Sequence, residues 1–372
     1  MKNGVHKKKV AFILPSLGAG GAERVILNIL KYWDRESSTP VLIVLDKRGK
    51  LADQVPDDIE IIELGCKKVR RSLWKLVFVL RRIRPDSVLV TLNHLIAVFP
   101  IIRYFIPRSI RIYARMSIVP EHVKNIENHY SKISLLLKLF LPAYDGLVCQ
   151  SYFMKNALIS QFNIDSKKVY VIYNPIDSSR ILPYLHLACS TNYKKSSSFD
   201  ILAIGRLSSQ KRFDRLIEAM RMLTDLPVRL FICGEGPLEE WLKEYASQLG
   251  VDHIVHFLGH QSNVYELMIR SDILVLTSEF EGIPNVALEA NACGLPVISF
   301  LFPGGIDEII KDGLNGYLIR DCQVESLVEV IRKIVHDYPF ERKKISDITL
   351  QQYGAAHIVP RIQHLLLSNS PN

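Results

Sequence analysis

Two cations stand five positions apart in the segment 205–211, which reads Gly-Arg-Leu-Ser-Ser-Gln-Lys. The segment follows a β-branched run, so Gly205, Arg206 and Lys211 lie where a predicted strand turns into a helix. A guanidinium grips a diphosphate through its planar fork, and an ammonium adds a compact charge. This pair is suited to stabilise the negative charge that develops as a nucleoside diphosphate leaves. A solvated basic loop is the alternative interpretation of this segment by itself.

Two carboxylates eight positions apart form a second candidate set. Glu281 is predicted in a turn with Gly282 and Pro284, and Glu289 within the following helix. Carboxylates accept hydrogen bonds from neighbouring sugar hydroxyls. Because the segment around Glu289 is apolar, a buried carboxylate there needs polar partners. The alternative is a pair of surface glutamates.

Glycines precede predicted helices at two further turns. Gly20 and Gly21 follow the first predicted strand, and Gly304 and Gly305 precede Glu308. Glycine lets the backbone approach a ligand closely, and a helix N-terminus offers free N–H groups to an anion. The first spacing is G-x-G-G and not the dinucleotide fingerprint G-x-G-x-x-G, and a tight corner explains it equally well.

Taken together, these turns resemble the retaining glycosyltransferases of family 4, which have the two-domain GT-B architecture. The resemblance extends over essentially the whole chain and also includes Gly294-Leu-Pro296. It implies a nucleotide-diphosphate sugar donor. The residues that it assigns to donor binding are Gly20, Gly21, Gly205, Arg206, Lys211, His260, Glu281, Gly282, Glu289, Gly304, Gly305 and Glu308.

The resemblance also implies a role for individual side chains. Arg206 and Lys211 would neutralise the donor diphosphate, helped by the backbone amides of the N-terminal glycines. Glu289 would bind the ribose hydroxyls, and Glu281 would hold the donor sugar near its reacting carbon. His260 would form a wall of the nucleobase pocket.

One departure from the family concerns a histidine that many relatives carry near the sugar. The corresponding stretch here contains Arg115, and His94 and His122 are the other candidates. Arg115 is preferred, since a subgroup acting on lipid-linked oligosaccharides resembles this chain in that respect. The implied catalytic set is therefore Glu281, Arg206, Lys211 and Arg115.

Strands must place these residues, and short β-branched runs alternate with helical periods throughout the chain. The predicted strands are 10–14, 41–45, 87–91, 110–114 and 146–150, then 200–204, 229–233, 254–257, 273–277 and 296–299. This alternation predicts an α/β protein with two Rossmann-like, doubly wound domains facing across a cleft. The predicted divisions are an acceptor-binding domain at 1–176, a linker at 177–198, a nucleotide-sugar domain at 199–345, and a C-terminal helix at 346–372 that crosses back.

Composition limits the class of protein. Hydrophobic residues make up 48% and charged residues 23%, which is typical of a folded chain. Six scattered cysteines without a C-x-x-C pair favour a reducing compartment over a zinc site. The apolar run 10–14 ends at Pro15 and predicts a strand, not a signal peptide. With no D-x-D pair either, we expect a cytoplasmic enzyme that needs no metal or other cofactor.

The net charge of +9 is unevenly spread. Between Lys67 and Lys132 there are 14 Lys or Arg residues and three acids. Aromatic and aliphatic residues alternate with cations over 73–84, which predicts binding to anionic lipid headgroups. A helix with its basic face in water is the alternative. No nucleic-acid-binding module is evident.

The family resemblance implies a retaining glycosyltransferase, and the basic charge of 67–132 predicts a peripheral membrane protein at the cytoplasmic face of the inner membrane. The expected donor is a UDP-hexose or UDP-N-acetylhexosamine. The expected acceptor is a lipid-linked oligosaccharide, lipopolysaccharide or other polysaccharide precursor. Three other classes stay open: a nucleotide-sugar epimerase of the same architecture, a dinucleotide-dependent oxidoreductase, and a non-catalytic binding scaffold.

Overall fold

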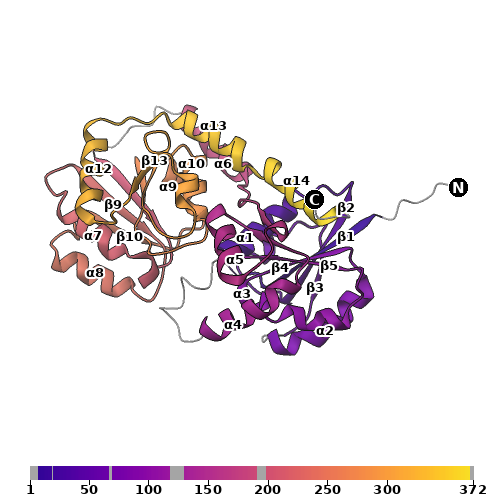
Figure 1. Cartoon of the computed structure of the whole chain (residues 1–372). Coiled ribbons are helices and arrows are strands. Elements are labelled where there is room, and N and C mark those ends of the chain that lie inside the picture. Colours follow the sequence, from indigo (N-terminus) through magenta and orange to yellow (C-terminus); the bar gives the residue numbers. More distant parts are fainter. Residues whose placement is uncertain (1–6, 19, 67–68, 118–129, 191–197, 369–372) are drawn as a thin grey trace. The chain divides into compact units, whose positions relative to one another are not determined.

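A computed structural model describes residues 7–18, 20–66, 69–117, 130–190 and 198–368. The chain divides into two compact units (Figure 1). Unit 1 takes the chain up to Pro175 together with the segment from Ala355 onward, and unit 2 is Ile176–Gly354. Each unit is built around one parallel sheet, as the alternating strands and helices predict.

Unit 1 contains a seven-stranded sheet in the order β3-β2-β1-β4-β5-β6-β7. Its strands are β1 (Lys8–Ser16), β2 (Ser38–Asp46), β3 (Glu60–Glu63), β4 (Ser87–Thr91), β5 (Arg111–Arg115), β6 (Gly146–Cys149) and β7 (Val169–Val171). Its helices are α1 (Gly21–Lys31), α2 (Val69–Ile83), α3 (Asn93–Ile96), α4 (Tyr130–Phe140), α5 (Tyr152–Phe162) and α14 (Ala355–Leu367), with the 3-10 segments η1 (Ala52–Gln54), η2 (Phe99–Phe105), η4 (Leu141–Ala143) and η5 (Ser166–Lys168).

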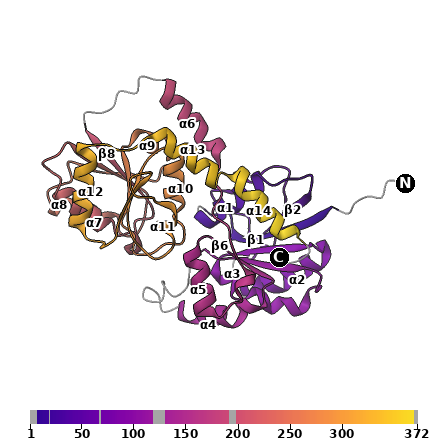
Figure 2. The same cartoon turned by 45° about the horizontal axis from the view of Figure 1, so that its top comes forward.

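Both faces of this sheet are covered, and the strand pattern shows why. In β1, Ala11 and Ile13 pack with α2, α3 and α5, whereas Val10 and Phe12 pack with α1 and α14 (Figure 2). Successive side chains of a strand point to opposite faces, so a sheet covered by helices on both sides needs continuously apolar strands.

Unit 2 contains a six-stranded sheet in the order β10-β9-β8-β11-β12-β13. Its strands are β8 (Phe199–Ile204), β9 (Val228–Cys233), β10 (Val255–Gly259), β11 (Ile273–Leu276), β12 (Val297–Phe300) and β13 (Gly316–Ile319). Its helices are α6 (Ser178–Ser190), α7 (Phe213–Arg221), α8 (Glu239–Gln248), α9 (Tyr265–Arg270), α10 (Asn285–Ala292), α11 (Ile306–Ile309), α12 (Val324–His336) and α13 (Arg342–Tyr353), with the 3-10 segment η6 (Ser209–Lys211).

The strand order confirms the predicted pair of doubly wound sheets. In each sheet the first strand of the unit lies between its second and fourth strands, which creates a switch point at the carboxyl ends. Ligands of open α/β sheets bind at such a point. In unit 2 the switch point lies between β8 and β11. A ligand is therefore expected to bind at the loops that leave these two strands.

The structure differs from the sequence interpretation at the predicted linker 177–198. Helix α6 occupies Ser178–Ser190 there and belongs to unit 2. Asn263 donates a hydrogen bond from Nδ2 to the Tyr184 hydroxyl at 2.7 Å, which ties α6 to the segment before α9. Residues 191–197 lie outside the described part of the chain.

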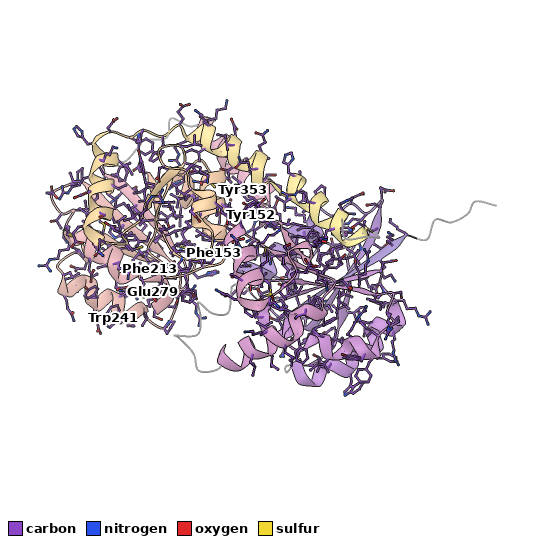
Figure 3. The ribbon with its side chains drawn as sticks, viewed as in Figure 1. Tyr152, Phe153, Phe213, Trp241, Glu279 and Tyr353 are labelled. Carbon is purple, nitrogen blue, oxygen red and sulfur yellow. The ribbon has the colours of Figure 1, made fainter. Side chains whose placement is uncertain are left out.

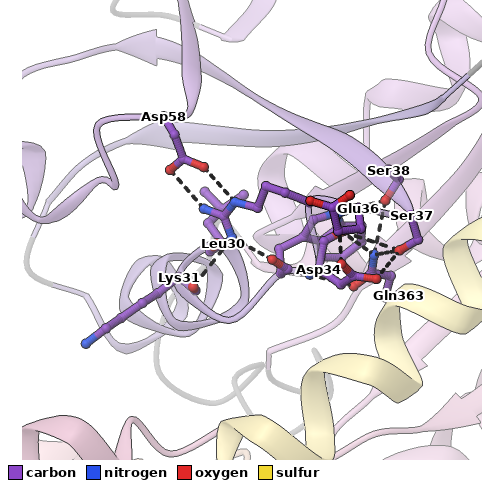
Figure 4. A network of polar contacts seen from close by, with 10 residues as sticks. Leu30, Lys31, Asp34, Glu36, Ser37, Ser38, Asp58 and Gln363 are labelled. Atoms are coloured by element: carbon purple, nitrogen blue, oxygen red, sulfur yellow. Dashed lines mark hydrogen bonds and ion pairs between the residues drawn. The ribbon is translucent and has the colours of Figure 1, made fainter.

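The C-terminal segment predicted at 346–372 is divided between the two units. Helix α13 ends at Tyr353 in unit 2, whereas α14 belongs to unit 1. Gln363 on α14 accepts the N–H of Asp34 at 3.0 Å. Its amide nitrogen donates to Ser37 Oγ at 2.7 Å and to Ser38 Oγ at 3.1 Å (Figure 4). These bonds fix α14 to the start of β2.

Candidate functional site

The loop that leaves β8 carries Gly205 near its start and Lys211 near its end. The N–H of Gly205 donates to the carbonyl of Cys233 on the neighbouring strand at 3.0 Å. A Cβ placed on Gly205 would lie 3.1 Å from Cε of Lys211. The lysine side chain therefore crosses back over the glycine, and the lack of a side chain at position 205 leaves room for it.

This loop is fastened to the loop that leaves β11. The Thr277 hydroxyl lies 3.0 Å and 2.8 Å from the carbonyl oxygens of Lys211 and Arg212. Arg212 also donates from Nη1 to Glu279 at 2.8 Å. Glu279 and Phe213, the first residue of α7, are both labelled in Figure 3. A buried hydroxyl at the end of β11 thus fixes the backbone on which Lys211 stands.

Two further bonds join the same loops. The N–H of Glu279 donates to the Gln210 carbonyl at 2.9 Å, and Gln210 donates from Nε2 to the Phe280 carbonyl at 2.8 Å. These contacts run in both directions between segments that are far apart in sequence. The two loops therefore form one rigid edge of the sheet at its switch point.

At the centre of this edge, the ammonium of Lys211 forms an ion pair with the carboxylate of Glu281. Ser278 donates its hydroxyl to the same carboxylate oxygen at 2.8 Å. The side chains of Lys211 and Glu281 are 16% and 13% exposed. Low exposure strengthens the attraction between the charges, and the serine offsets part of the desolvation of the carboxylate.

The loop that leaves β12 packs on the backbone of Glu281. The N–H of Glu281 donates to the carbonyl of Pro303 at 3.2 Å. Gly304 has φ of +149°, and a Cβ there would overlap the carbonyl oxygens of Glu281 and Gly282. The structure thus brings together five predicted site residues from three loops. They are Gly205, Lys211, Glu281, Gly282 and Gly304.

Arg206 lies on the same edge but is exposed. The carbonyl of Arg206 accepts the N–H of Ser208 at 2.8 Å. Its guanidinium has no hydrogen-bond or ion-pair partner in the described residues. The edge therefore presents one unpaired cation beside a neutral ion pair.

The remaining predicted site residues of unit 2 are His260, Glu289, Gly305 and Glu308. His260 is exposed directly after β10, the strand at the edge of the sheet, and among the described residues no hydrogen bond or ion pair joins it to Lys211 or Glu281. Glu289 is half-buried on α10. Gly305 precedes α11, a helix of only four residues that includes Glu308, which is half-buried.

In unit 1, the predicted glycine turn stands at the start of α1. Gly20 is the N-cap, and its carbonyl accepts the N–H of Arg24 at 3.2 Å. A Cβ on Gly20 would overlap the carboxylate of Glu23. Negative charge is stabilising at a helix N-terminus, so the chain places its own carboxylate beside Gly20 and Gly21, where an anion would bind.

Arg115 ends β5 of unit 1 and is only 1% exposed. Its Nη2 donates to Oδ1 of Asn174, but Nη1 has no hydrogen-bond partner among the residues that the structure describes. Burial lowers the pKa of Arg115 to about 10, because the charged guanidinium is desolvated. A buried cation without a carboxylate partner suits an anionic or hydroxyl-bearing ligand. The side chain of His94 and the whole of His122 lie outside the described residues.

Sequence reasoning missed the residues that hold the site in place. Thr277, Ser278 and Gln210 each supply a bond to the Lys211 loop or to Glu281. The signal that could have found Thr277 and Ser278 is their position directly after the apolar strand β11, where a polar residue enters the switch point. Gln210 stands inside the predicted basic motif, but its partner depends on the strand order.

Among the described residues, no group of three or more His, Cys, Asp or Glu side chains is placed to hold a metal ion. Helices long and apolar enough to cross a membrane are also absent from this part of the chain. The five cysteines that the structure describes are free thiols.

Comparison with known proteins matches both halves of the chain. The family described as Glycosyltransferase Family 4 matches residues 19–180, and that described as Glycosyl transferases group 1 matches residues 191–350. A similar curated protein is the N-acetylgalactosamine-N,N'-diacetylbacillosaminyl-diphospho-undecaprenol 4-alpha-N-acetylgalactosaminyltransferase of Campylobacter jejuni. It is 27% identical over 344 residues, which cover 89% of this chain and 91% of that protein.

Solved structures of the same fold include Anabaena HepE in complex with UDP, with a TM-score of 0.77 and 21% identity. The match covers 96% of this chain and 99% of HepE. The apo form of the lipopolysaccharide outer core galactosyltransferase WaaB matches with a TM-score of 0.74 and 21% identity. It covers 97% of this chain and 100% of WaaB.

Proposed function

This chain belongs to the group 1, family 4 glycosyltransferases of the GT-B fold, and we propose that it is a retaining enzyme with a UDP-sugar donor. The donor sugar is a hexose or an N-acetylhexosamine. The acceptor is a lipid-linked oligosaccharide, lipopolysaccharide or other polysaccharide precursor. The similar enzyme of Campylobacter jejuni, whose name specifies a diphospho-undecaprenol acceptor, supports a lipid-linked acceptor.

The observation that carries this proposal is the Lys211–Glu281 ion pair, held over Gly205 where the loops from β8 and β11 meet. In this proposal Arg206 and Lys211 bind the donor diphosphate. As the bond between the sugar and the diphosphate breaks, their positive charges stabilise the negative charge on the leaving phosphate. Because Lys211 is already fixed by Glu281, it needs no reorganisation during the reaction.

The other residues have positioning roles in the proposal. Glu281 holds a hydroxyl of the donor sugar, and Glu289 accepts hydrogen bonds from the ribose. His260 borders the nucleobase, and the loop at Gly304 fixes the backbone of Glu281. The backbone around Gly20, Gly21, Gly305 and Glu308 completes the donor contacts.

In this proposal Arg115 takes the place of the histidine that many relatives carry near the sugar. Its Nη1 is buried without a hydrogen-bond partner in the described part of the chain, and we assign it a contact with the reacting sugar or its phosphate. The acceptor hydroxyl attacks the face that the UDP leaves, and the departing phosphate oxygen takes its proton. The anomeric configuration is therefore retained. No metal takes part in this scheme, because cationic side chains hold the diphosphate.

The test is transfer from a panel of radiolabelled nucleotide sugars to a membrane extract, with and without EDTA. We expect one UDP-sugar to label a lipid-extractable product, with activity unchanged by EDTA, and NMR of the product to show a retained anomeric configuration. Turnover of the donor without any acceptor would favour the epimerase instead. Inversion at the anomeric carbon would refute the retaining mechanism.

A further inference from the structure

Helix α2 of unit 1 exposes large aromatic side chains to solvent. Trp74 and Phe78, one helical turn apart, are each 67% exposed. The opposite side of the helix is ordinary core, where Leu76 and Leu80 are fully buried. A large, contiguous apolar patch on the surface of a folded protein is typical of an interaction site.

The 3-10 segment η2 extends this apolar surface. The ring of Phe105 packs edge-on against Trp74, with ring centroids 4.9 Å apart. Arg81 of α2 donates from Nε to the carbonyl of Phe105 at 2.6 Å. Tyr104, next to Phe105, is 90% exposed. The two elements thus form a single surface and not two isolated patches.

Cations share the exposed side of α2 with the aromatic residues. Lys75, Arg81 and Arg82 are all exposed. At 100° per residue, they and the two aromatic residues span about 120° of the helix surface, with Trp74 and Phe78 between the cations. We call this surface the α2–η2 face, made of Trp74, Lys75, Phe78, Arg81, Arg82, Tyr104 and Phe105.

Carboxylates are rare in the sequence around these cations. The stretch 69–117 contains a single carboxylate, Asp86, which accepts the backbone N–H of Lys9 at 2.8 Å. In the described part of the chain, none of the three cations has a carboxylate partner: Lys75 and Arg81 bond to backbone carbonyls, and Arg82 has no partner. The α2–η2 face is therefore both apolar and positively charged, and it requires an anionic, amphipathic partner.

We propose that the α2–η2 face docks the protein on an anionic lipid bilayer. Trp74, Phe78 and Tyr104 enter the headgroup region, where amphipathic aromatic rings are favoured, while the cations contact lipid phosphates. At 15 residues α2 is shorter than the roughly 20 needed to span a bilayer, so it lies in the plane of the surface. This inference deepens the proposed function and rests on it for the lipid-linked acceptor.

A second copy of the chain fits this surface poorly. A two-fold dimer brings the same patch of both subunits together, so the cations of one copy would face those of the other. Like charges in contact destabilise such an interface. A bilayer rich in anionic headgroups neutralises the cations and accepts the aromatic rings at the same time.

The experiment is sedimentation of the full chain with vesicles of phosphatidylcholine alone or mixed with phosphatidylglycerol. We expect binding to the mixed vesicles, little to phosphatidylcholine alone, and weaker binding at high salt. Each cation near an anionic surface contributes about fivefold to the partition coefficient, so Arg81→Gln/Arg82→Gln should lower it about 25-fold. Trp74→Ser/Phe78→Ser should also weaken binding, including the part that resists salt.

Matched controls come from unit 2. Lys343→Gln/Lys344→Gln removes two exposed cations from α13, and Trp241→Ser removes an exposed tryptophan from α8. Both should bind the mixed vesicles as the unmodified chain does. Thermal unfolding and UDP binding, measured on every variant, establish that the fold and the donor site are intact.

Three outcomes would overturn the docking proposal. They are absence of the unmodified chain from anionic vesicles, unchanged binding of Arg81→Gln/Arg82→Gln, and a solution dimer that this variant dissociates. The last result would assign the face to a second copy. Because binding is measured without donor or acceptor, a chain that docks but transfers no sugar refutes the proposed function and not the docking.

Discussion

The ammonium of Lys211 is paired with the carboxylate of Glu281, 70 positions away in the sequence. The hydroxyl of Ser278 donates a second hydrogen bond to the carboxylate of Glu281, and the ion pair is mostly buried. Its net charge is zero, so the positive charge offered to a diphosphate at this edge comes first from the exposed Arg206. Lys211 is thus held by an ion pair, whereas Arg206 is exposed to solvent, and this difference leads to two predictions.

The first prediction concerns Glu281→Gln. The change removes a negative charge beside the proposed diphosphate site and releases Lys211, so UDP should bind several-fold more tightly. Transfer should nevertheless fall by about 10²–10³, since the carboxylate no longer holds the sugar in place. Calorimetric titration of UDP and initial transfer rates measure the two effects. A variant that loses UDP affinity and rate in parallel would contradict the assigned role of Glu281.

The second prediction contrasts Arg206→Ala with Lys211→Met. Each should lower the transfer rate by about 10²–10⁴. Because the Arg206 guanidinium has no partner among the described residues, its loss should change the free energy of unfolding by no more than about 0.5 kcal/mol. Lys211→Met leaves the Glu281 carboxylate, which is 13% exposed, without its cationic partner. This change should lower the free energy of unfolding by about 2–3 kcal/mol, somewhat less than for a fully buried pair.

Denaturant unfolding and transfer rates, measured on both variants, separate these effects. Arg221→Ala is the matched control, since Arg221 is another exposed arginine of unit 2 and lies at the end of α7. It should change neither quantity. Full transfer activity in Arg206→Ala would remove the diphosphate assignment.

Most strands could be predicted from the sequence as apolar runs, including four-residue strands such as β11, whereas β3, β7 and β13 could not. Runs such as 41–45 and 273–277 are apolar on both faces, a pattern typical of buried parallel strands. The missed strands β3, β7 and β13 have only three or four residues, and β3 begins and ends with glutamate. Helix α6 was missed because its serines and Pro183 resemble a linker.

The site was predictable at the level of motifs but not of contacts. Gly205, Lys211, Glu281 and Gly304 were singled out by residue type and spacing, and the structure brings them together. The bonds made by Thr277 follow from β8 lying beside β11, and local sequence does not state that strand order. The role of each residue in catalysis stays a prediction.

The third prediction concerns Arg115→Met. The pKa of Arg115 is about 10 in the folded chain, which is below its ordinary value, so the unfolded chain binds the proton more tightly. The charged guanidinium therefore opposes folding by an amount on the order of 3 kcal/mol at every pH below about 10. This penalty diminishes only as the pH rises above about 10.

Methionine keeps much of the volume and removes the buried charge, while Asn174 loses one hydrogen bond at a cost of about 1 kcal/mol. We expect Arg115→Met to raise the free energy of unfolding by about 1–2 kcal/mol, equally at pH 7 and pH 9, and to abolish transfer. Arg115→Lys, which keeps a cation, should recover part of the activity. A lower unfolding temperature for Arg115→Met would show that the arginine stabilises the fold and is not retained for a ligand.

The fourth prediction compares two glycines that both have positive φ. Gly304 has φ of +149° and sits against the carbonyls of Glu281 and Gly282, whereas Gly250 has φ of +73° with open space around it. Gly250→Ala should cost about 1 kcal/mol, the strain of a left-handed alanine alone. Gly304→Ala adds steric overlap and should lower the free energy of unfolding by at least about 3 kcal/mol. Because the new methyl group must displace the backbone of Glu281, transfer should fall in Gly304→Ala and stay unchanged in Gly250→Ala. Equal unfolding free energies for the two variants would mean that the loop from β12 does not hold Glu281 in place.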